Sequence, residues 1–194
     1  MAKTESGPAV IGATMPRFQL PDVDGRLHAN AELTGANGTL VAFLCTHCPY
    51  VKHIAPALAE ITEDLRHSGI ATIAINPNDP AENPEDGPDG MRAAADEYGY
   101  RFPYLIDTDQ DTTRSFRAVC TPDFFLFDRH DSLYYRGQLD SSRPGNWLPV
   151  TGEDLRGAVA AMLTGESAPA IQTPSLGCSI KWREQRPSEQ WEAR

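Results

Sequence analysis

The feature that most constrains the chain is the stretch of residues 39–61, in which an apolar run passes through two cysteines into an amphipathic pattern. Residues 40–44, Leu-Val-Ala-Phe-Leu, have the length and composition of a buried strand. Over residues 51–65 apolar side chains recur at spacings of three and four, which predicts an amphipathic helix. Cys45 and Cys48 lie between these two segments. The stretch therefore predicts a strand–helix unit with two thiols at the joint.

The position of Pro49 indicates where the helix begins. Proline is favoured in the first helical turn, because the N–H group that it lacks has no partner there. Cys48 then lies near the N-cap, where unpaired N–H groups and the helix dipole stabilise negative charge and lower the pKa of a thiol. The pattern predicts a thiolate at Cys48, which is the chemistry of a redox nucleophile.

Length, charge and hydropathy limit the class of protein. With 194 residues the chain suits one domain with extensions, and its net charge of −10 argues against nucleic acid and anionic membrane surfaces as partners. We see no signal peptide, and no apolar run approaches the ~20 residues of a membrane-spanning helix. We therefore expect a cytoplasmic protein. Thiols stay reduced there, so the four cysteines indicate catalysis, redox sensing, metal binding or packing rather than a disulfide scaffold.

The rest of the chain alternates between strand-like and helix-like segments. Asp24-Gly25 predicts the turn of a short hairpin, and Gly69 follows the last periodic residue of the first helix. Residues 76–90 are rich in proline and acidic side chains, so we expect a solvated insertion loop there. The predicted elements, in chain order, are a hairpin from residue 16, a strand at 39–45, a helix at 49–66, a strand at 70–75, a helix at 91–98, a strand at 104–106, a helix at 111–116, strands at 124–127 and 133–135, and a helix at 153–163.

This order of elements resembles the redoxin branch of the thioredoxin superfamily (AhpC/TSA), and within it a peroxiredoxin-like subgroup with Cys-x-His-Cys-Pro-Tyr and a tail like residues 175–182. The matching segments are residues 16–20 with 22–25, then 43–58, 102–107 and 121–128. The resemblance implies an α/β protein with a thioredoxin-like fold: a central mixed β-sheet flanked by helices, an N-terminal β-hairpin and an insertion loop. It also divides the chain into a flexible N-terminus (1–13), a redoxin domain (14–165) and a C-terminal surface tail (166–194).

The register of the family motif selects Cys48 as the nucleophile. Thioredoxin-like proteins carry a proline eight positions after the nucleophilic cysteine, and Pro56 stands eight positions after Cys48. Val51 occupies the position of their second cysteine, whereas Cys45 lies upstream, at the end of the predicted strand. The resemblance therefore implies a shifted Cys-x-x-Cys pair, with Cys48 as the nucleophile and Cys45 as its resolving partner.

The same register argues against a peroxidase. Peroxiredoxins carry Thr or Ser three residues before the peroxidatic cysteine and Pro seven residues before it, and these positions hold Cys45 and Val41 here. The hydroxyl group that orients a peroxide is therefore missing from this position. The candidates for an arginine that activates a peroxide are Arg114, Arg117, Arg136 and Arg143.

Thr121-Pro122 resembles the cis-proline segment that faces the active-site cysteine in thioredoxin folds. In the family, the backbone before this proline pairs with substrate like an added strand, so Thr121 is a candidate substrate contact. Together with His47 and Pro49, these two residues form the predicted substrate-binding set. His47 has two interpretations, a residue that tunes the thiolate and a solvated loop residue.

The two remaining cysteines have different predicted roles. Cys120 is expected to pack in the core as a small apolar residue, since free cysteine is commonly buried. Cys178 in the tail is either a possible resolving thiol that returns to Cys48 or a structural residue, and the sequence favours the structural role.

These observations predict a thiol–disulfide oxidoreductase that acts through the Cys48 thiolate and its Cys-x-x-Cys pair, without an organic cofactor or a metal. The expected substrate is a protein or small-molecule disulfide, and the electron donor is thioredoxin or a low-molecular-weight thiol. One alternative is a peroxiredoxin-like thiol peroxidase that reduces hydroperoxides in an antioxidant role. The other is a redoxin without catalysis, in which Cys45, Cys48 and a histidine bind a soft metal.

Overall fold

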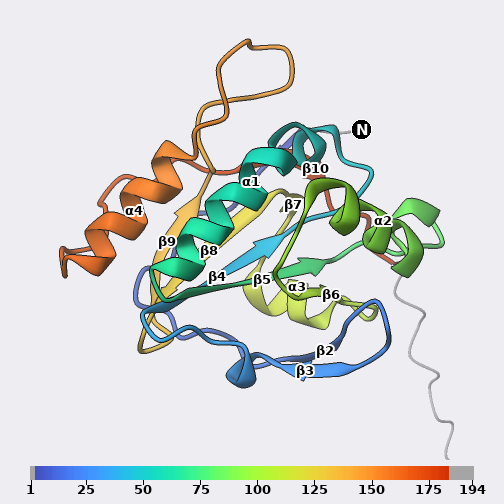
Figure 1. Ribbon diagram of the computed structural model, residues 1–194, viewed down its shortest axis with the longest axis horizontal. Helices are drawn as coiled ribbons and strands as arrows, with labels where there is room; N and C mark the ends of the chain where they lie inside the picture. Colours follow the sequence, from blue (N-terminus) through green and yellow to red (C-terminus); the bar gives the residue numbers. More distant parts are fainter. Residues whose placement is uncertain (1–2, 184–194) are drawn as a thin grey trace, which may run out of the picture.

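A computed structural model describes residues 3–183, and its centre is a five-stranded mixed β-sheet with the order β6-β5-β4-β8-β9 (Figure 1). The strands of this sheet are β4 (Gly38–Phe43), β5 (Ile70–Asn76), β6 (Tyr104–Ile106), β8 (Asp123–Asp128) and β9 (Leu133–Gly137). β4, β5 and β6 run parallel, whereas β8 is antiparallel to both of its neighbours, β4 and β9. The predicted α/β class with a central mixed sheet is confirmed.

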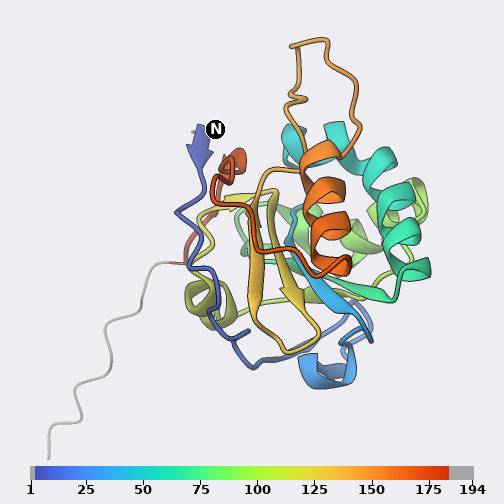
Figure 2. The same ribbon diagram turned by 90° about the vertical axis from the view of Figure 1, so that its left-hand side faces the viewer.

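Both faces of the sheet are covered, which explains the continuous apolar run in β4. Leu40 and Ala42 pack in the core beneath α1 (Pro49–His67) and α4 (Glu153–Leu163). Val41 and Phe43 pack on the opposite face, in the core that contains Phe116 of α3 (Asp111–Phe116). The side-on view in Figure 2 shows α1 and α4 together on one side of the sheet.

The helix α1 follows the predicted pattern closely. It begins at Pro49 and ends at His67, and its buried residues include the predicted apolar positions. Gly69 follows with a φ of 77°, a backbone conformation that glycine adopts without strain. No helix within residues 3–183 is long and apolar enough to cross a lipid bilayer.

The N-terminal hairpin and the insertion loop contain further elements. The hairpin consists of β2 (Gln19–Pro21) and β3 (Leu27–Ala29), followed by the short helix η1 (Asn30–Glu32). The predicted insertion loop contains a second short helix, η2 (Pro84–Asp86), and leads into α2 (Pro88–Tyr98), which begins three residues before the predicted start.

The prediction that the acidic loop is solvated is wrong for Asp86. Its side chain is fully buried, although the exposed neighbour Glu85 fits the prediction. The reason is tertiary, because donors from the loop before α1, and Asn78 from the start of the same acidic loop, converge on the Asp86 carboxylate. Composition cannot identify which acid of such a loop turns inward.

The two ends of the described chain form a second sheet that the sequence analysis did not predict. It consists of β1 (Lys3–Glu5), β10 (Leu176–Ser179) and β7 (Cys120–Thr121), in the order β1-β10-β7. β1 lies in the segment expected to be a flexible N-terminus (1–13), and β10 lies in the expected surface tail (166–194). Cys178 and Ile180 of this tail are buried, so the tail is part of the packed structure here, while its residues 184–194 lie outside the described residues.

Candidate active site

The nucleophile candidate Cys48 occupies the N-cap position of α1, as predicted. Its backbone is extended, with φ −72° and ψ 122°, and Pro49 follows at the start of the helix. The unpaired N–H groups of the first turn therefore surround the sulfur with positive potential. Cys48 is nevertheless 0% exposed, so its sulfur is covered by other parts of the chain.

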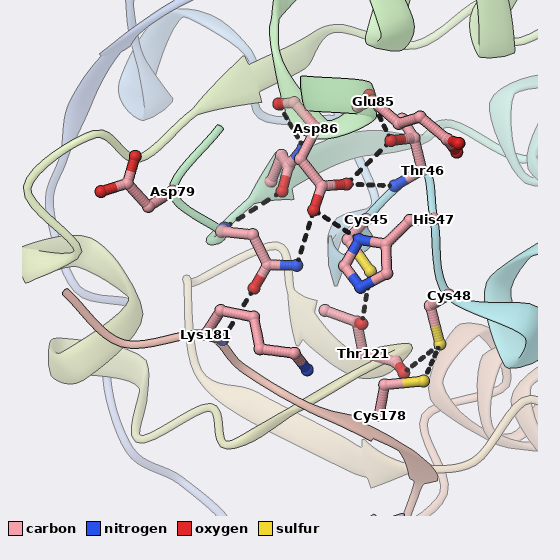
Figure 3. Close-up of polar contacts among 12 residues, drawn as sticks. Cys45, Thr46, His47, Cys48, Asp79, Glu85, Asp86, Thr121, Cys178 and Lys181 are labelled. Carbon is pink, nitrogen blue, oxygen red and sulfur yellow. Dashed lines mark hydrogen bonds and ion pairs between the residues drawn. The ribbon is translucent and has the colours of Figure 1, made fainter. Parts of the chain in front are cut away.

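Two groups from distant segments contact the Cys48 sulfur (Figure 3). The Sγ atom of Cys178 lies 2.7 Å from the Sγ atom of Cys48, in direct contact. The carbonyl oxygen of Thr121 lies 3.3 Å from the same sulfur. All four cysteines are free thiols in this structure. The arrangement brings a second thiol within reach of disulfide formation with only a small movement.

The surroundings of Cys48 favour its thiolate. The hydrogen bond from Cys178 lowers the pKa of Cys48 most, and a further hydrogen bond from Cys45 lowers it again, against the opposing effect of burial. The same hydrogen bond raises the pKa of Cys178, so that thiol keeps its proton. Cys48 is therefore the group that carries negative charge, and Cys178 is a neutral donor to it.

Cys45 lies two residues after the end of β4, in the loop before α1. Its Sγ atom is 2.9 Å from the Oγ1 atom of Thr121. Burial, followed by the hydrogen bond to Cys48, raises the pKa of Cys45 well above its ordinary value. Cys45 is thus a protonated thiol in the core, bound to Thr121, the same residue whose carbonyl oxygen contacts Cys48.

The peptide bond between Thr121 and Pro122 is cis, as the resemblance implied. Thr121 contacts both Cys45, through its side chain, and Cys48, through its carbonyl oxygen. In β7 it is also the partner of Cys178 in the antiparallel pairing with β10. The segment predicted to bind substrate therefore lies beside the nucleophile, and a strand of the same chain is paired with it.

His47 is held by Asp86 and is not the solvated loop residue that one interpretation offered. Its Nδ1 atom lies 2.5 Å from Asp86 Oδ2, and its side chain is 10% exposed. Because an ionised carboxylate only accepts hydrogen bonds, Nδ1 carries a proton and donates it. The other ring nitrogen, Nε2, is buried and has no hydrogen-bond partner among residues 3–183.

Asp86 is a residue of this site that sequence reasoning missed. Its carboxylate accepts hydrogen bonds from the backbone N–H of Thr46 at 2.8 Å and from Nδ2 of Asn78 at 3.0 Å, besides the bond from His47. Asn78 in turn accepts a hydrogen bond from the backbone N–H of Lys181 in the tail, at 2.9 Å. The network in Figure 3 thus connects the loop before α1 to the C-terminal tail.

Cys45, His47 and Asp86 are the group most similar to a metal site in the described part of the chain. One possible ligand atom from each lies within 4.8 Å of the others. However, both oxygens of Asp86 already accept hydrogen bonds from the protein, which leaves one thiol and one imidazole nitrogen as free ligands. Stable sites usually supply three or four ligands, so this cluster fits an oriented hydrogen-bond network better than a metal.

Cys120 and Arg136 lie away from the nucleophile. Cys120 is fully buried, as predicted, and burial raises its pKa. Arg136, one of the candidates for activating a peroxide, donates to the buried carboxylate of Asp123 at 2.9 Å. Arg143, another candidate, donates to Gln138 and to nearby carbonyl oxygens. Neither side chain contacts Cys48.

Comparison with known proteins gives a family match and a similar fold. Residues 11–136 match the model of the AhpC/TSA family. A solved structure of a hypothetical protein from Sinorhizobium meliloti 1021 is 44% identical to this chain, with a TM-score of 0.90 over 93% of this chain and 98% of that one. A secreted disulfide oxidoreductase from Mycobacterium tuberculosis has the same fold, with a TM-score of 0.56 at 17% identity over 74% of this chain and 95% of its own.

A curated relative carries a functional name. The thiol-disulfide oxidoreductase ResA of Geobacillus thermodenitrificans (strain NG80-2) is 27% identical over 130 residues, which are 67% of this chain and 70% of the relative.

Proposed function

The chain belongs to the AhpC/TSA family, and from this membership together with the geometry of the thiols we propose that it is a thiol–disulfide oxidoreductase with Cys48 as its nucleophile. One observation carries the proposal: a cysteine at a helix N-terminus, with a lowered pKa, contacts a second thiol at 2.7 Å. The thiolate can attack a disulfide, and the second thiol can then release Cys48 from the mixed disulfide. The name of the relative ResA supports the same reaction class.

The reaction begins with attack of the Cys48 thiolate on one sulfur of a substrate disulfide. A bond forms between this sulfur and Cys48, the substrate S–S bond breaks, and the departing thiolate takes up a proton. A second thiol of the protein then loses its proton and attacks the Cys48 sulfur. This step forms an internal disulfide and releases the other half of the substrate as a thiol, so the substrate gains two electrons and the protein loses two.

Two thiols are candidates for the second step. Cys45 is the partner in the Cys-x-x-Cys pair, and its hydrogen bond to Cys48 supports this role. Cys178 is in direct contact with the nucleophile, at 2.7 Å. His47 and Asp86 keep the loop that carries Cys45 in position, because their hydrogen bonds fix the two residues between the cysteines.

Peroxide reduction is less well supported. The position of the peroxide-orienting hydroxyl is Cys45, and the buried Arg136 binds Asp123 rather than approaching Cys48. The electron donor, thioredoxin or a small thiol, and the cytoplasmic location stay predictions from the sequence.

The test compares two oxidants on the fully reduced protein. Stoichiometric oxidised glutathione and hydrogen peroxide are mixed with it separately in stopped flow, and the products are mapped by mass spectrometry. We expect glutathione to be found on Cys48 and then released, while peroxide reacts about as fast as with free cysteine. Peroxide consumption far faster than that of free cysteine, with no reaction of the disulfide, would contradict the proposal.

A further inference from the structure

The tail strand β10 lies where an extended peptide would pair with the active site. It is antiparallel to β7, with Cys178 opposite Thr121 and Ser179 opposite Cys120. Thr121 immediately precedes the cis-proline and contacts the nucleophile through its carbonyl oxygen. Backbone pairing of this kind is how a sheet edge takes up an added strand. Here the added strand comes from the same chain.

With β10 in this place the nucleophile has no access to solvent. Cys48 and Cys45 are 0% exposed and Cys178 is 2% exposed. The strand also carries its own sulfur to the Cys48 sulfur, at 2.7 Å. A peptide substrate would have to present its sulfur at the same point to form a mixed disulfide. The tail therefore both covers the site and reproduces the position of a substrate.

The close approach of β10 depends on a glycine. A Cβ atom at Gly177 would lie 1.9 Å from the carbonyl oxygen of Thr121 and 3.0 Å from Cδ of Pro122. A methyl group at this residue cannot be accommodated unless the strand moves away from β7. Gly177 thus lets β10 pack directly on the cis-proline segment, next to the residue that carries the thiol.

Hydrogen bonds hold the tail on both sides of β10. Before the strand, Ser6 and Ser175 exchange two hydrogen bonds, of 2.8 and 2.9 Å. After it, the backbone of Lys181 donates to Asn78 at 2.9 Å and accepts from Gln110 at 2.8 Å. Apolar contacts hold the tail as well, since Ile180 packs in the core on one face of the central sheet. β10 nevertheless belongs to the small sheet β1-β10-β7 and not to the five-stranded central sheet. Such a strand is able to detach locally while the central sheet stays folded.

We propose that β10 is a resident substrate: it occupies the site of an external cysteine-containing peptide, and Cys178 rather than Cys45 forms the internal disulfide with Cys48. This inference rests on the proposed function. An external partner must take the place of β10 along Thr121, so the partner that fits is an extended polypeptide segment with a cysteine in a disulfide. The return of β10 then expels the partner.

The chemistry of the cycle balances within the groups named. After an external disulfide has reacted with Cys48, the mixed disulfide joins Cys48 to one half of it. Cys178 loses its proton, its sulfur bonds to Cys48, and the S–S bond to the external half breaks. The released thiolate takes up the proton. The external disulfide has become two thiols, and Cys48 and Cys178 have been oxidised to a disulfide by the loss of two electrons.

The first experiment identifies the resolving thiol. Reduced wild-type protein and the variants Cys178→Ser and Cys45→Ser are each treated with stoichiometric oxidised glutathione, quenched in acid and mapped by mass spectrometry. We expect glutathione to persist on Cys48 in Cys178→Ser only, and a Cys48–Cys178 disulfide in wild type and in Cys45→Ser. Persistence in Cys45→Ser only would overturn the inference and leave the proposed function intact. An internal disulfide of Cys48 without persistent glutathione in all three would overturn the assignment to Cys178 alone and leave the proposed function intact. Neither glutathione nor an internal disulfide on Cys48 in any of the three would overturn both.

The second experiment tests whether β10 covers the site. Alkylation of Cys48 by iodoacetamide is timed in the reduced wild type, in Gly177→Ala, and in the matched control Gly157→Ala, whose added Cβ meets no atom within 4 Å. We expect the rate to rise at least about tenfold in Gly177→Ala, because the clash favours the detached strand, and to change less than about twofold in Gly157→Ala. Equal rates in a Gly177→Ala protein with wild-type circular dichroism would overturn the inference.

Discussion

Cys45 and Cys178 approach the same sulfur, that of Cys48, from two different parts of the fold. Cys45 lies three residues before Cys48 and two residues after the end of the central strand β4, in the loop that Asp86 holds through Thr46 and His47. Cys178 lies 130 residues after Cys48, on a strand outside the central sheet that pairs with β1 and β7 and whose close approach depends on Gly177. Both are neutral thiols beside one thiolate.

The two thiols differ in whether they can leave the site while the domain stays folded. A thiol that directly follows a central strand, in a buried loop, is present whenever the domain is folded. A thiol on a peripheral strand is present only while that strand is docked, and its free energy of docking is smaller than that of global unfolding. The Cys45 thiol is therefore a fixed part of the site, whereas the Cys178 thiol is part of it only while β10 is docked.

The largest effect is expected from removing the Cys48 sulfur, which both thiols flank. In Cys48→Ser we expect the rate of reaction with oxidised glutathione to fall at least about a thousandfold, because neither flanking thiol is a thiolate. The reaction is followed by release of glutathione in single turnover. Cys120→Ala is the control, since it removes a buried thiol that makes no hydrogen bond to the cluster, and its rate should match wild type. A fast Cys48→Ser would assign the nucleophile to another cysteine.

The position of the loop that carries Cys45 is expected to depend on Asp86. In Asp86→Asn the amide cannot accept all the hydrogen bonds that the buried carboxylate accepts from Thr46, His47 and Asn78. We expect the free energy of unfolding to fall by about 2–3 kcal/mol. Urea denaturation measures it. Glu85→Gln changes the neighbouring exposed carboxylate, and a change above about 0.5 kcal/mol there would mean that charge rather than the buried network is responsible.

The electrostatic effects of the two thiols on Cys48 are separable by titration. Loss of either donor removes stabilisation of the thiolate, so the pKa of Cys48 rises and the thiolate is protonated at higher pH as the solution is acidified. We expect Cys178→Ala to raise the pKa of Cys48 by about 1–2 units, because one hydrogen bond to a charged group has about this effect. Cys45→Ala is expected to raise the same pKa less. The ultraviolet absorbance of the thiolate follows this titration and does not require a reagent to reach the buried sulfur. A larger shift in Cys45→Ala would reverse the comparison.

The smallest effect is expected at the hydroxyl that holds Cys45. Thr121→Val removes the hydrogen bond between Oγ1 and the Cys45 sulfur but keeps the backbone that pairs with β10. We expect the free energy of unfolding to fall by about 1 kcal/mol, with the alkylation rate of Cys48 unchanged. Thermal and urea denaturation measure the first quantity. A marked rise in alkylation would indicate that the side chain of Thr121, and not only its backbone, keeps the tail docked.

Local patterns in the sequence determined the central domain. The continuous apolar run of β4 and the spacing of three and four in α1 each need only their own residues, because a buried strand and an amphipathic helix have characteristic periods. Pro49 fixed the start of α1, and with it the N-cap position of Cys48. The cis-proline after Thr121 followed from the family resemblance. These features were predicted because each depends on neighbours in the chain.

The tertiary structure alone decided which groups contact the Cys48 sulfur. Strands β1 and β10, of three and four residues, are too short to show an alternating apolar pattern. Their pairing also joins residues that are far apart in the sequence. Nothing in the acidic loop distinguishes the buried Asp86 from the exposed Glu85 before donors from other segments converge on it. The sequence alone determined that Cys48 lies at the N-cap of α1. The packing of distant segments decided that Cys178 lies against it and lowers its pKa, because contacts between such segments leave no periodic pattern in either one.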